Sequence, residues 1–223
     1  MIKGVFFDID DTLYNSTVLA RMARRNSVKA MIDAGLPVRD EEKVYRRLLG
    51  VIRRFGPNHG RHYDELLRDL GVPWSPKIVA AGVVAYEHTK AGYLKPFPGV
   101  VPTLLELRRN YRLGVISNGL AVKQWEKLIW MGIHHLFDLV ATSEELGSEK
   151  PDEEIFQYAV RGLGLKPAEC VMVGDRLDTD ILGAKKSGMR TILIGKGPKA
   201  RETDATVGAV TEVPRALERL SRR

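Results

Sequence analysis

The stretch Val5-Phe6-Phe7-Asp8-Ile9-Asp10-Asp11-Thr12-Leu13 decides how the rest of the chain is interpreted. Its short apolar run ends abruptly in three carboxylates within four residues. Strands of parallel sheets are buried on both faces, so their sequences are continuously apolar. Ligands of such sheets bind just beyond the carboxyl ends of the strands. The stretch therefore predicts a first strand that delivers Asp8 and Asp10 to a site.

An Asp-rich turn after a strand is the simpler interpretation, because Asp is a common turn and cap residue. A turn accounts for one acidic residue, for which Asp11 is the best candidate. It does not account for three unneutralised carboxylates, which repel one another. Such a cluster calls for a cation, and hard oxygen ligands suit Mg²⁺. The stretch therefore favours a magnesium site over a plain turn.

Composition places the chain among globular proteins and excludes disordered ones. It has 223 residues, enough for one or two domains, with 44% hydrophobic and 28% charged residues. The single cysteine, Cys170, excludes an intramolecular disulfide and fits a reducing compartment. We find no signal-peptide pattern at the start and no apolar run as long as a membrane span. We therefore expect a cytoplasmic protein with no membrane partner.

The net charge of +7 permits a nucleic-acid partner but does not argue for one. The basic residues are scattered in local clumps, and the sequence shows neither zinc-finger spacing nor an RNA-binding signature. A basic surface also steers small anionic substrates toward a cleft. We expect no nucleic acid as a partner, and the sequence does not separate a monomer from a homodimer.

The pattern of apolar and polar residues changes at two points along the chain. Residues 16–94 show helical spacing without a convincing strand, with helices expected near 16–31, 41–52, 62–70 and 76–90. From Lys95-Pro96-Phe97-Pro98-Gly99 onward, helices and strands alternate, which is typical of a parallel α/β sheet. Strands are expected at 112–117, 139–143, 170–174 and 190–194, with an edge strand at 207–210 and helices at 101–110, 121–131, 152–163, 178–187 and 213–220. We therefore expect an α/β core of residues 1–15 and 95–223, with an all-helical domain of residues 16–94 inserted after the first strand.

Polar residues follow several of the expected strands, and parallel strands end at one edge of a sheet. Asp8 and Asp10 would meet Ser117 and Asn118 there, together with Lys150 and the group Asp175, Asp178 and Asp180. Each has a simpler explanation except Asp175. Asn118-Gly119 is typical of a hairpin, although a helical pattern follows it here. Lys150 alone fits a solvated loop lysine, and Asp178 fits a helix cap. Together the set predicts phosphoryl transfer, in which carboxylates hold Mg²⁺ and a lysine neutralises charge.

These residues resemble the haloacid dehalogenase-like hydrolases, specifically the phosphatases with a helical cap after the first strand. The matching motifs occur in order along the chain: Asp8-x-Asp10-x-Thr12, Ser117-Asn118, Lys150-Pro151 and Gly174-Asp175-x-x-x-x-Asp180. The resemblance covers essentially the whole core. It implies a Rossmann-like, doubly wound parallel sheet with a mobile helical cap, acting on a small phosphorylated metabolite.

The resemblance also implies roles for these residues. Asp8 would accept the phosphoryl group, Asp10 would act as acid and then base, and Lys150 would neutralise charge. Ser117, Asn118 through nearby backbone amides, and Thr12 would bind the substrate. Mg²⁺ would be held by Asp8, the Asp10 carbonyl and Asp175, with Asp180 close by or acting through water. His59, in an expected cap loop, is a further candidate for substrate contact, although an exposed loop histidine is an equally good explanation.

Two other functions compete with a phosphatase. Dehalogenases of the same superfamily lack the second carboxylate, so Asp10 argues against a 2-haloacid dehalogenase. A non-catalytic binding protein on the same fold would not need Asp8, Asp10, Lys150 and Asp175 together. The sequence does not identify the physiological phosphate ester.

Overall fold

The computed structural model of the chain describes residues 1–195 and 202–222. The chain divides into two compact units, which are described separately below. One contains Met1–Asn15 and Lys95–Arg223, and the other contains Ser16–Leu94. We call them the sheet unit and the helical unit. None of the helices among the described residues is long and apolar enough to cross a membrane.

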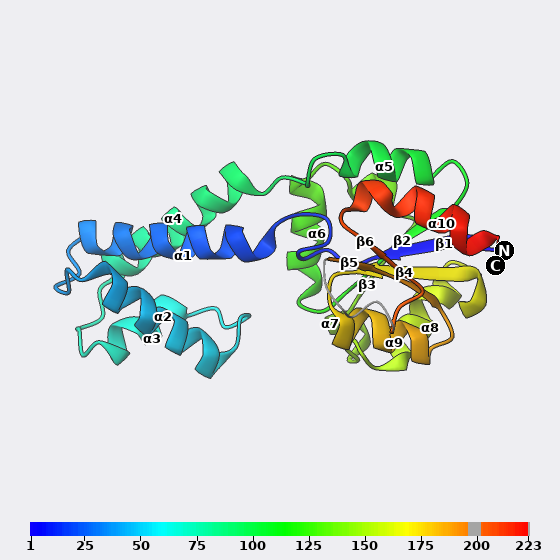
Figure 1. Ribbon diagram of the computed structural model, residues 1–223. Coiled ribbons are helices and arrows are strands. Elements are labelled where there is room, and N and C mark those ends of the chain that lie inside the picture. Colours follow the sequence, from blue (N-terminus) through cyan, green and yellow to red (C-terminus); the bar gives the residue numbers. More distant parts are fainter. Residues whose placement is uncertain (196–201, 223) are drawn as a thin grey trace. The chain divides into compact units, whose positions relative to one another are not determined.

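The sheet unit is built on six parallel strands in the order β3-β2-β1-β4-β5-β6 (Figure 1). The strands are β1 (Gly4–Phe7), β2 (Arg112–Ser117), β3 (Leu139–Thr142), β4 (Cys170–Gly174), β5 (Arg190–Ile194) and β6 (Ala205–Val207). The expected parallel α/β fold is thus confirmed. The chain builds outward from β1 to β2 and β3, then returns to add β4 on the other side of β1. The strand order therefore reverses between β1 and β4, which is where ligands of such sheets bind.

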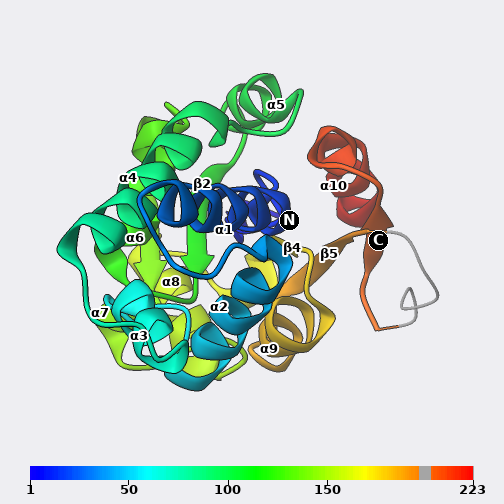
Figure 2. The ribbon, with the colours of Figure 1, turned by 90° about the vertical axis from the view of Figure 1, so that its left-hand side faces the viewer.

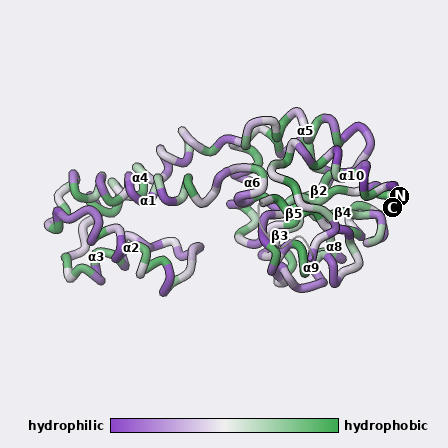
Figure 3. The backbone as a smooth tube through the Cα atoms, in the orientation of Figure 1, coloured by the Kyte–Doolittle hydropathy of each residue, from purple (hydrophilic) through white to green (hydrophobic). Residues whose placement is uncertain are grey.

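Helices cover both faces of the sheet, as Figures 1 and 2 show. The helices α5 (Val100–Leu107) and α10 (Val213–Ser221) lie on one face, and α8 (Glu153–Gly162) and α9 (Leu182–Lys186) lie on the other. Successive strand residues point to opposite faces, so Phe6 and Met172 pack with Phe156 of α8 while their neighbours face α5 and α10. Burial on both faces explains why the central strands are continuously apolar, as the hydropathy colouring of Figure 3 shows.

The helical unit contains α1 (Ser16–Asp33), α2 (Glu41–Phe55), α3 (His62–Asp69) and α4 (Pro76–Tyr93). It has its own apolar core, to which Val28, Leu48 and Leu66 contribute from three different helices. The caps follow from the sequence: the side chain of Asp40 accepts a hydrogen bond from the backbone N–H of Lys43 at the start of α2. The four helices lie where helical spacing predicts them, and α2 and α4 each extend about one turn further.

Other elements of the sheet unit are α6 (Ala121–Trp130), α7 (Ser143–Leu146) and the short 3-10 turns η1 (His134–Leu136), η2 (Pro167–Glu169) and η5 (Val210–Glu212). Two sequence predictions need correction. The edge strand β6 is Ala205–Val207 rather than 207–210, because Asp204 anchors it by accepting hydrogen bonds from the backbone and hydroxyl of Thr191. The helix expected at 178–187 begins instead as a π-helical turn, η3 (Leu177–Ile181), and continues as α9.

Candidate active site

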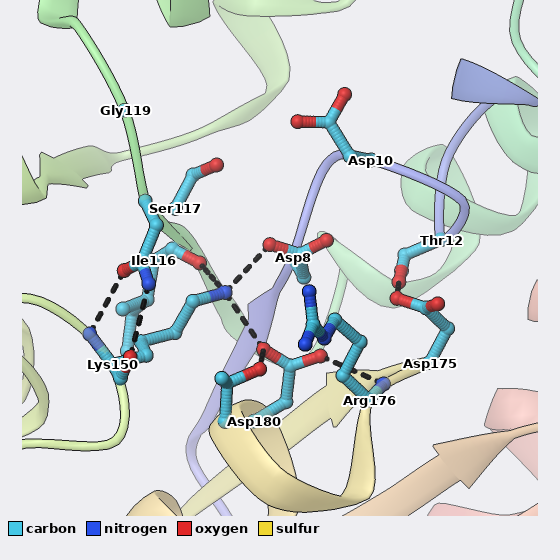
Figure 4. A network of polar contacts seen from close by, with 12 residues as sticks. Asp8, Asp10, Thr12, Ile116, Ser117, Gly119, Lys150, Asp175, Arg176 and Asp180 are labelled. Carbon is cyan, nitrogen blue, oxygen red and sulfur yellow. Dashed lines mark hydrogen bonds and ion pairs between the residues drawn. The ribbon is translucent and has the colours of Figure 1, made fainter. Parts of the chain in front are cut away.

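Backbone pairing brings the acidic strand ends together. Phe7 is level with Val173 of β4 and with Val115 of β2, so the residues that follow these strands meet at one edge. The backbone N–H of Asp8 still donates to the carbonyl of Val173, at 3.0 Å, and Asp8 therefore leaves the sheet beside β4. Asp175 is the first residue beyond β4. Both carboxylates thus lie at the point where the strand order reverses. Figure 4 shows the side chains of Asp8 and Asp175 at this edge.

Lys150 is a buried cation among these carboxylates (Figure 4). Its Nζ donates to Asp8 Oδ1 at 2.6 Å and to the carbonyl oxygen of Ile116 at 2.8 Å, and it lies 2.7 Å from Asp180 Oδ1. An ammonium group has three protons, so all three are used. The simpler interpretation of Lys150 as a solvated loop lysine is therefore wrong for this fold.

Asn118 holds the backbone of Lys150 in place. Its Oδ1 accepts from the Lys150 N–H at 2.8 Å, and its Nδ2 donates to the Lys150 carbonyl at 3.0 Å. The peptide bond between Lys150 and Pro151 is cis. The side chain of Asn118 is thus occupied in fixing the lysine loop against the end of β2. Its expected contribution to substrate binding, through nearby backbone amides, stays a prediction.

Asp180 reaches the site through the π-helical turn η3. Single π-helical turns of this kind are frequent at functional sites. The turn places the Asp180 side chain beneath the end of β4, where its Oδ2 accepts from the backbone N–H of Arg176 at 3.1 Å. A Cβ atom on Gly174 would overlap the Asp180 side chain, so only glycine fits there. Asp178, expected as a helix cap, makes no cap. Its carboxylate pairs with the Arg176 guanidinium at 3.1 Å at the surface.

Crowding of carboxylates raises the affinity of the site for positive charge. Burial raises the pKa of Asp8, and the carboxylates of Asp180 and Asp10 add to this against the opposing effect of Lys150. Burial and the carboxylate of Asp180 likewise raise the pKa of Asp175, to about 6. Burial opposes the charge of Lys150, but the attraction of Asp8 and Asp180 outweighs it and raises the lysine pKa. One ammonium therefore faces more acidic groups than it can neutralise.

A divalent cation fits this excess of negative charge. Oxygens of Asp8, Asp175 and Asp180 lie within 4.8 Å of one another. Carboxylate oxygens are the donors that Mg²⁺ prefers. The hydroxyl of Thr12 contacts Asp175 Oδ1 at 3.4 Å, so Thr12 orients one of these three carboxylates. Its expected contact with substrate stays a prediction.

Asp10 is held by residues that the motifs do not include. Lys127 Nζ, on α6, donates to both carboxylate oxygens of Asp10, at 2.6 and 2.8 Å, and the hydroxyl of Tyr14 donates to Oδ1 at 2.6 Å. Gln124 lies one turn before Lys127 and accepts from the buried hydroxyl of Ser117 at 3.2 Å. The sequence contains one signal for this pair: two polar residues three apart on a helix, just after Ser117-Asn118.

His59 belongs to the helical unit and is described within it. Its ring stacks on Phe55, with ring centres 4.9 Å apart, and the ring of His62 meets it edge-on. The Nε2 atom of His59 is buried and has no hydrogen-bond partner among the described residues. The histidine is therefore partly buried rather than a freely exposed loop residue, and its contact with substrate stays a prediction.

Comparison with known proteins identifies the group to which the chain is similar. The family model for haloacid dehalogenase-like hydrolases matches residues 2–188. A glyceraldehyde 3-phosphate phosphatase of Methanopyrus kandleri is 57% identical over 199 residues, which cover 88% of this chain and 85% of that protein.

Two further similarities extend over nearly the full length. A glyceraldehyde 3-phosphate phosphatase of Pyrococcus furiosus is 43% identical over 227 residues, covering 99% of this chain and 94% of that protein. The crystal structure of a HAD phosphatase from Thermococcus onnurineus superimposes with a TM-score of 0.72 at 26% identity, covering 97% of this chain and 98% of that one.

Proposed function

Because the chain belongs to the haloacid dehalogenase-like hydrolase family, we propose that it is a Mg²⁺-dependent phosphatase that hydrolyses glyceraldehyde 3-phosphate through a phosphorylated aspartate. Hydrolysis of phosphoric monoesters is the reaction class of its named relatives. The observation that carries the proposal is the grouping of Asp8 with Lys150, Asp175 and Asp180 at the point where the strand order reverses.

Asp8 is the nucleophile in this proposal. One of its carboxylate oxygens forms a bond to phosphorus while the bond from phosphorus to the ester oxygen breaks. Lys150 lies 2.6 Å from Asp8 Oδ1. It offsets the negative charge that accumulates on the attacking carboxylate and the phosphoryl oxygens. In this proposal the hydroxyl of Ser117, at the end of β2, turns from Gln124 to donate to a phosphoryl oxygen, and the backbone near Asn118 holds the other phosphoryl oxygens.

Asp10 moves the protons. It donates one to the departing ester oxygen, which leaves as an alcohol, and thereby becomes a carboxylate. It then takes a proton from a water molecule whose oxygen attacks phosphorus. The bond between phosphorus and Asp8 breaks, inorganic phosphate leaves, and Asp8 is again a free carboxylate. Asp10 is again protonated, so the cycle closes.

Mg²⁺ would be held by Asp8, Asp175 and the Asp10 carbonyl, with Asp180 beside them. When bound, the ion would supply positive charge that screens the phosphoryl oxygens from the acidic cluster. Three carboxylates within 4.8 Å of one another support this assignment. The raised pKa of Asp175, about 6, supports it as well, since the folded protein resists carrying these charges without a cation.

The substrate is inferred from the relatives. Glyceraldehyde 3-phosphate phosphatases at 57% and 43% identity cover most of this chain. Glyceraldehyde 3-phosphate is a small primary phosphate ester, which agrees with the expectation of a small phosphorylated metabolite. The helical unit is proposed to act as the cap that selects it.

Phosphate release from a panel of esters tests the proposal. The panel contains glyceraldehyde 3-phosphate, glycerol 3-phosphate, phosphoglycolate and 4-nitrophenyl phosphate, each with Mg²⁺ and with a chelator. Triose phosphates also lose phosphate spontaneously, so the Asp8→Asn variant provides the background rate. We expect Mg²⁺-dependent release, highest kcat/KM for glyceraldehyde 3-phosphate, and none above background in the variant. A higher kcat/KM for another ester would reject the substrate, and no release from any ester would reject the phosphatase.

A further inference from the structure

All three N–H donors of the Lys127 ammonium group are used by two neighbouring residues. Its ammonium group donates to Asp10 Oδ2 at 2.6 Å, to Asp10 Oδ1 at 2.8 Å and to Gln124 Oε1 at 2.9 Å. Three protons therefore meet three acceptors. The side chain is largely shielded from solvent, at 16% exposure. The geometry does not leave a proton of Lys127 directed at a phosphate ester.

Gln124 fixes the position of Lys127. Its Oε1 accepts from both Lys127 and Ser117, and its Nε2 donates to the carbonyl of Asn118 at 3.1 Å. These partners determine which end of the amide is oxygen, because a lysine ammonium only donates and a carbonyl only accepts. Gly119 makes the contact possible: its φ is 128°, and a Cβ atom there would lie 2.5 Å from Gln124 Nε2. A continuous network therefore connects the end of β2 to Asp10.

Asp10 accepts hydrogen bonds on both carboxylate oxygens, from Lys127 on Oδ1 and Oδ2 and from Tyr14 on Oδ1. These contacts fix the orientation of the Asp10 carboxyl group. A carboxylate has about four acceptor positions, so these three contacts leave room for one more donor. A water molecule is a donor of that kind. Figure 4 shows the Asp10 carboxylate above that of Asp8, from the same segment.

We propose that Lys127 is a positioning residue, anchored by Gln124, that holds the Asp10 carboxyl group in the orientation needed to take a proton from the water that hydrolyses phosphorylated Asp8. The inference rests on the proposed function. In the step concerned, the water proton passes to Asp10 while the water oxygen bonds to phosphorus. The bond between phosphorus and Asp8 breaks, and its electrons remain on the Asp8 carboxylate. Lys127 keeps its proton throughout.

The variants that test this role are Lys127→Met, Lys127→Arg and Lys123→Met. Methionine keeps an unbranched stem without the charge. Arginine can still donate to both oxygens of a carboxylate. Lys123 lies on the same helix and is exposed, so its replacement controls for loss of one positive charge on α6. Thermal melts establish that each variant is folded.

Pre-steady-state kinetics with 4-nitrophenyl phosphate separates the two halves of the reaction. In Lys127→Met, kcat should fall roughly 10- to 100-fold, since misplacing a reacting group costs about that much. Nitrophenolate should then appear in a burst stoichiometric with enzyme, while kcat/KM changes less than about threefold. The value of kcat/KM reports only the first half of the reaction, and nitrophenolate is a weak enough base to leave without a proton from Asp10. Lys127→Arg should recover much of kcat, and Lys123→Met should behave as the unsubstituted enzyme.

Other outcomes would overturn the inference. Equal loss of kcat and kcat/KM would place Lys127 in substrate binding or in the first half of the reaction. A higher kcat in Lys127→Met would show that the lysine slows the reaction. Unchanged kinetics would show that it has no role in the reaction. Crystal structures of both proteins give a readout independent of turnover. Asp10 should keep one side-chain orientation in the unsubstituted protein and lose it in Lys127→Met. An unaltered orientation of Asp10 in Lys127→Met would contradict the positioning role, whether or not the protein hydrolyses any ester. Absence of ester hydrolysis by the unsubstituted protein would separately reject the proposed function.

Discussion

Ion pairs at the centre of the sheet unit are buried, whereas those of the helical unit are exposed at the surface. In the sheet unit, Lys150 is buried between Asp8 and Asp180, with side-chain exposures of 3%, 10% and 1%. In the helical unit, ion pairs lie at the surface: the side chain of Arg47 is 54% exposed where it meets Asp69 at 3.4 Å. Buried charges are costly unless every one is paired, whereas surface pairs contribute little. The sheet unit therefore tolerates little change in its charges, and the helical unit tolerates much.

The two units also differ in net charge. Residues 16–94 contain 14 of the 35 lysines and arginines but only 8 of the 28 acidic residues, so they carry +6 of the total +7. The sheet unit is nearly neutral even though it contains the acidic cluster. A surplus of exposed positive charge attracts small anions over distances set by the ionic strength. This contrast in charge fits our proposal that the sheet unit performs the chemistry while the helical unit attracts and selects the substrate.

The largest effect should come from removing the buried cation. Lys150→Met leaves Asp8 and Asp180 without their shared ammonium, so the free energy of unfolding should fall by about 3–5 kcal/mol. Arg47→Met is the matched variant in the helical unit and should cost less than about 1 kcal/mol. Chemical denaturation of both proteins measures the contrast. Similar losses of unfolding free energy in the two variants would contradict the distinction between buried charges in the sheet unit and surface charges in the helical unit.

Metal binding should stabilise the sheet unit more strongly as pH rises. The raised pKa values of Asp8 and Asp175 mean that their ionisation destabilises the metal-free fold. The protonated carboxyl group of Asp175 contributes stability to the metal-free fold. This contribution is fully present below pH 3.8 and is lost as pH rises through the raised pKa of about 6. A saturating cation should offset the loss, by about 2.7 kcal/mol at a hundredfold excess over Kd.

Melting temperatures with Mg²⁺ and with chelator, at pH 5 and at pH 7.5, measure this effect. The Mg²⁺-induced rise in Tm should be larger at the higher pH and should shrink in Asp175→Asn. Equal rises at the two pH values would show that the acidic cluster is not where the ion acts.

A smaller effect is expected in the helical unit from His59→Ala. The buried Nε2 of His59 lacks a partner among the described residues, and a substrate group that supplied one would contribute about one hydrogen bond. KM for glyceraldehyde 3-phosphate should rise roughly three- to tenfold, with kcat nearly unchanged. His88→Ala, an exposed histidine of the same unit, is the control. An unchanged KM would reduce His59 to a packing residue on Phe55.

The smallest effect should be that of salt. If the positive charge of the helical unit attracts the substrate, kcat/KM should fall about two- to threefold between about 20 and 300 mM KCl, as the Debye length shortens. The value of kcat should stay constant, since the charge acts on encounter. If kcat/KM does not change with salt concentration, the positive charge of the helical unit does not attract the substrate.

The strands and their acidic ends were predictable because a strand buried on both faces has a distinctive composition. Four apolar residues before Asp8 and five nonpolar residues before Asp175 are enough to indicate parallel strands. The parallel topology then brings residues more than 160 positions apart to one edge. The convergence of Asp8, Lys150, Asp175 and Asp180 follows from that topology, while their roles in the reaction stay predictions.

The network around Asp10 was not predictable in the same way. Lys127 and Asp10 are 117 residues apart, and their contact depends on how α6 is rotated against the end of β2. Amphipathic spacing identifies the apolar face of a helix but not which polar residue turns toward a neighbour. The π-helical turn at Asp180 was missed for a related reason: its extra residue depends on contacts with Arg176 and Lys150 rather than on local propensity. The action of the helical unit as a mobile cap likewise stays a prediction.

Trapping the phosphorylated residue tests the central claim most directly. The enzyme is quenched during turnover of 4-nitrophenyl phosphate and treated with borohydride, which reduces an acyl phosphate to an alcohol. An aspartate that carried the phosphoryl group becomes homoserine, and mass spectrometry of the N-terminal peptides locates it. The account predicts homoserine at position 8 in the unsubstituted protein and none in Asp8→Asn. Homoserine at Asp10 or Asp175, or no modified residue during continuing turnover, would contradict it.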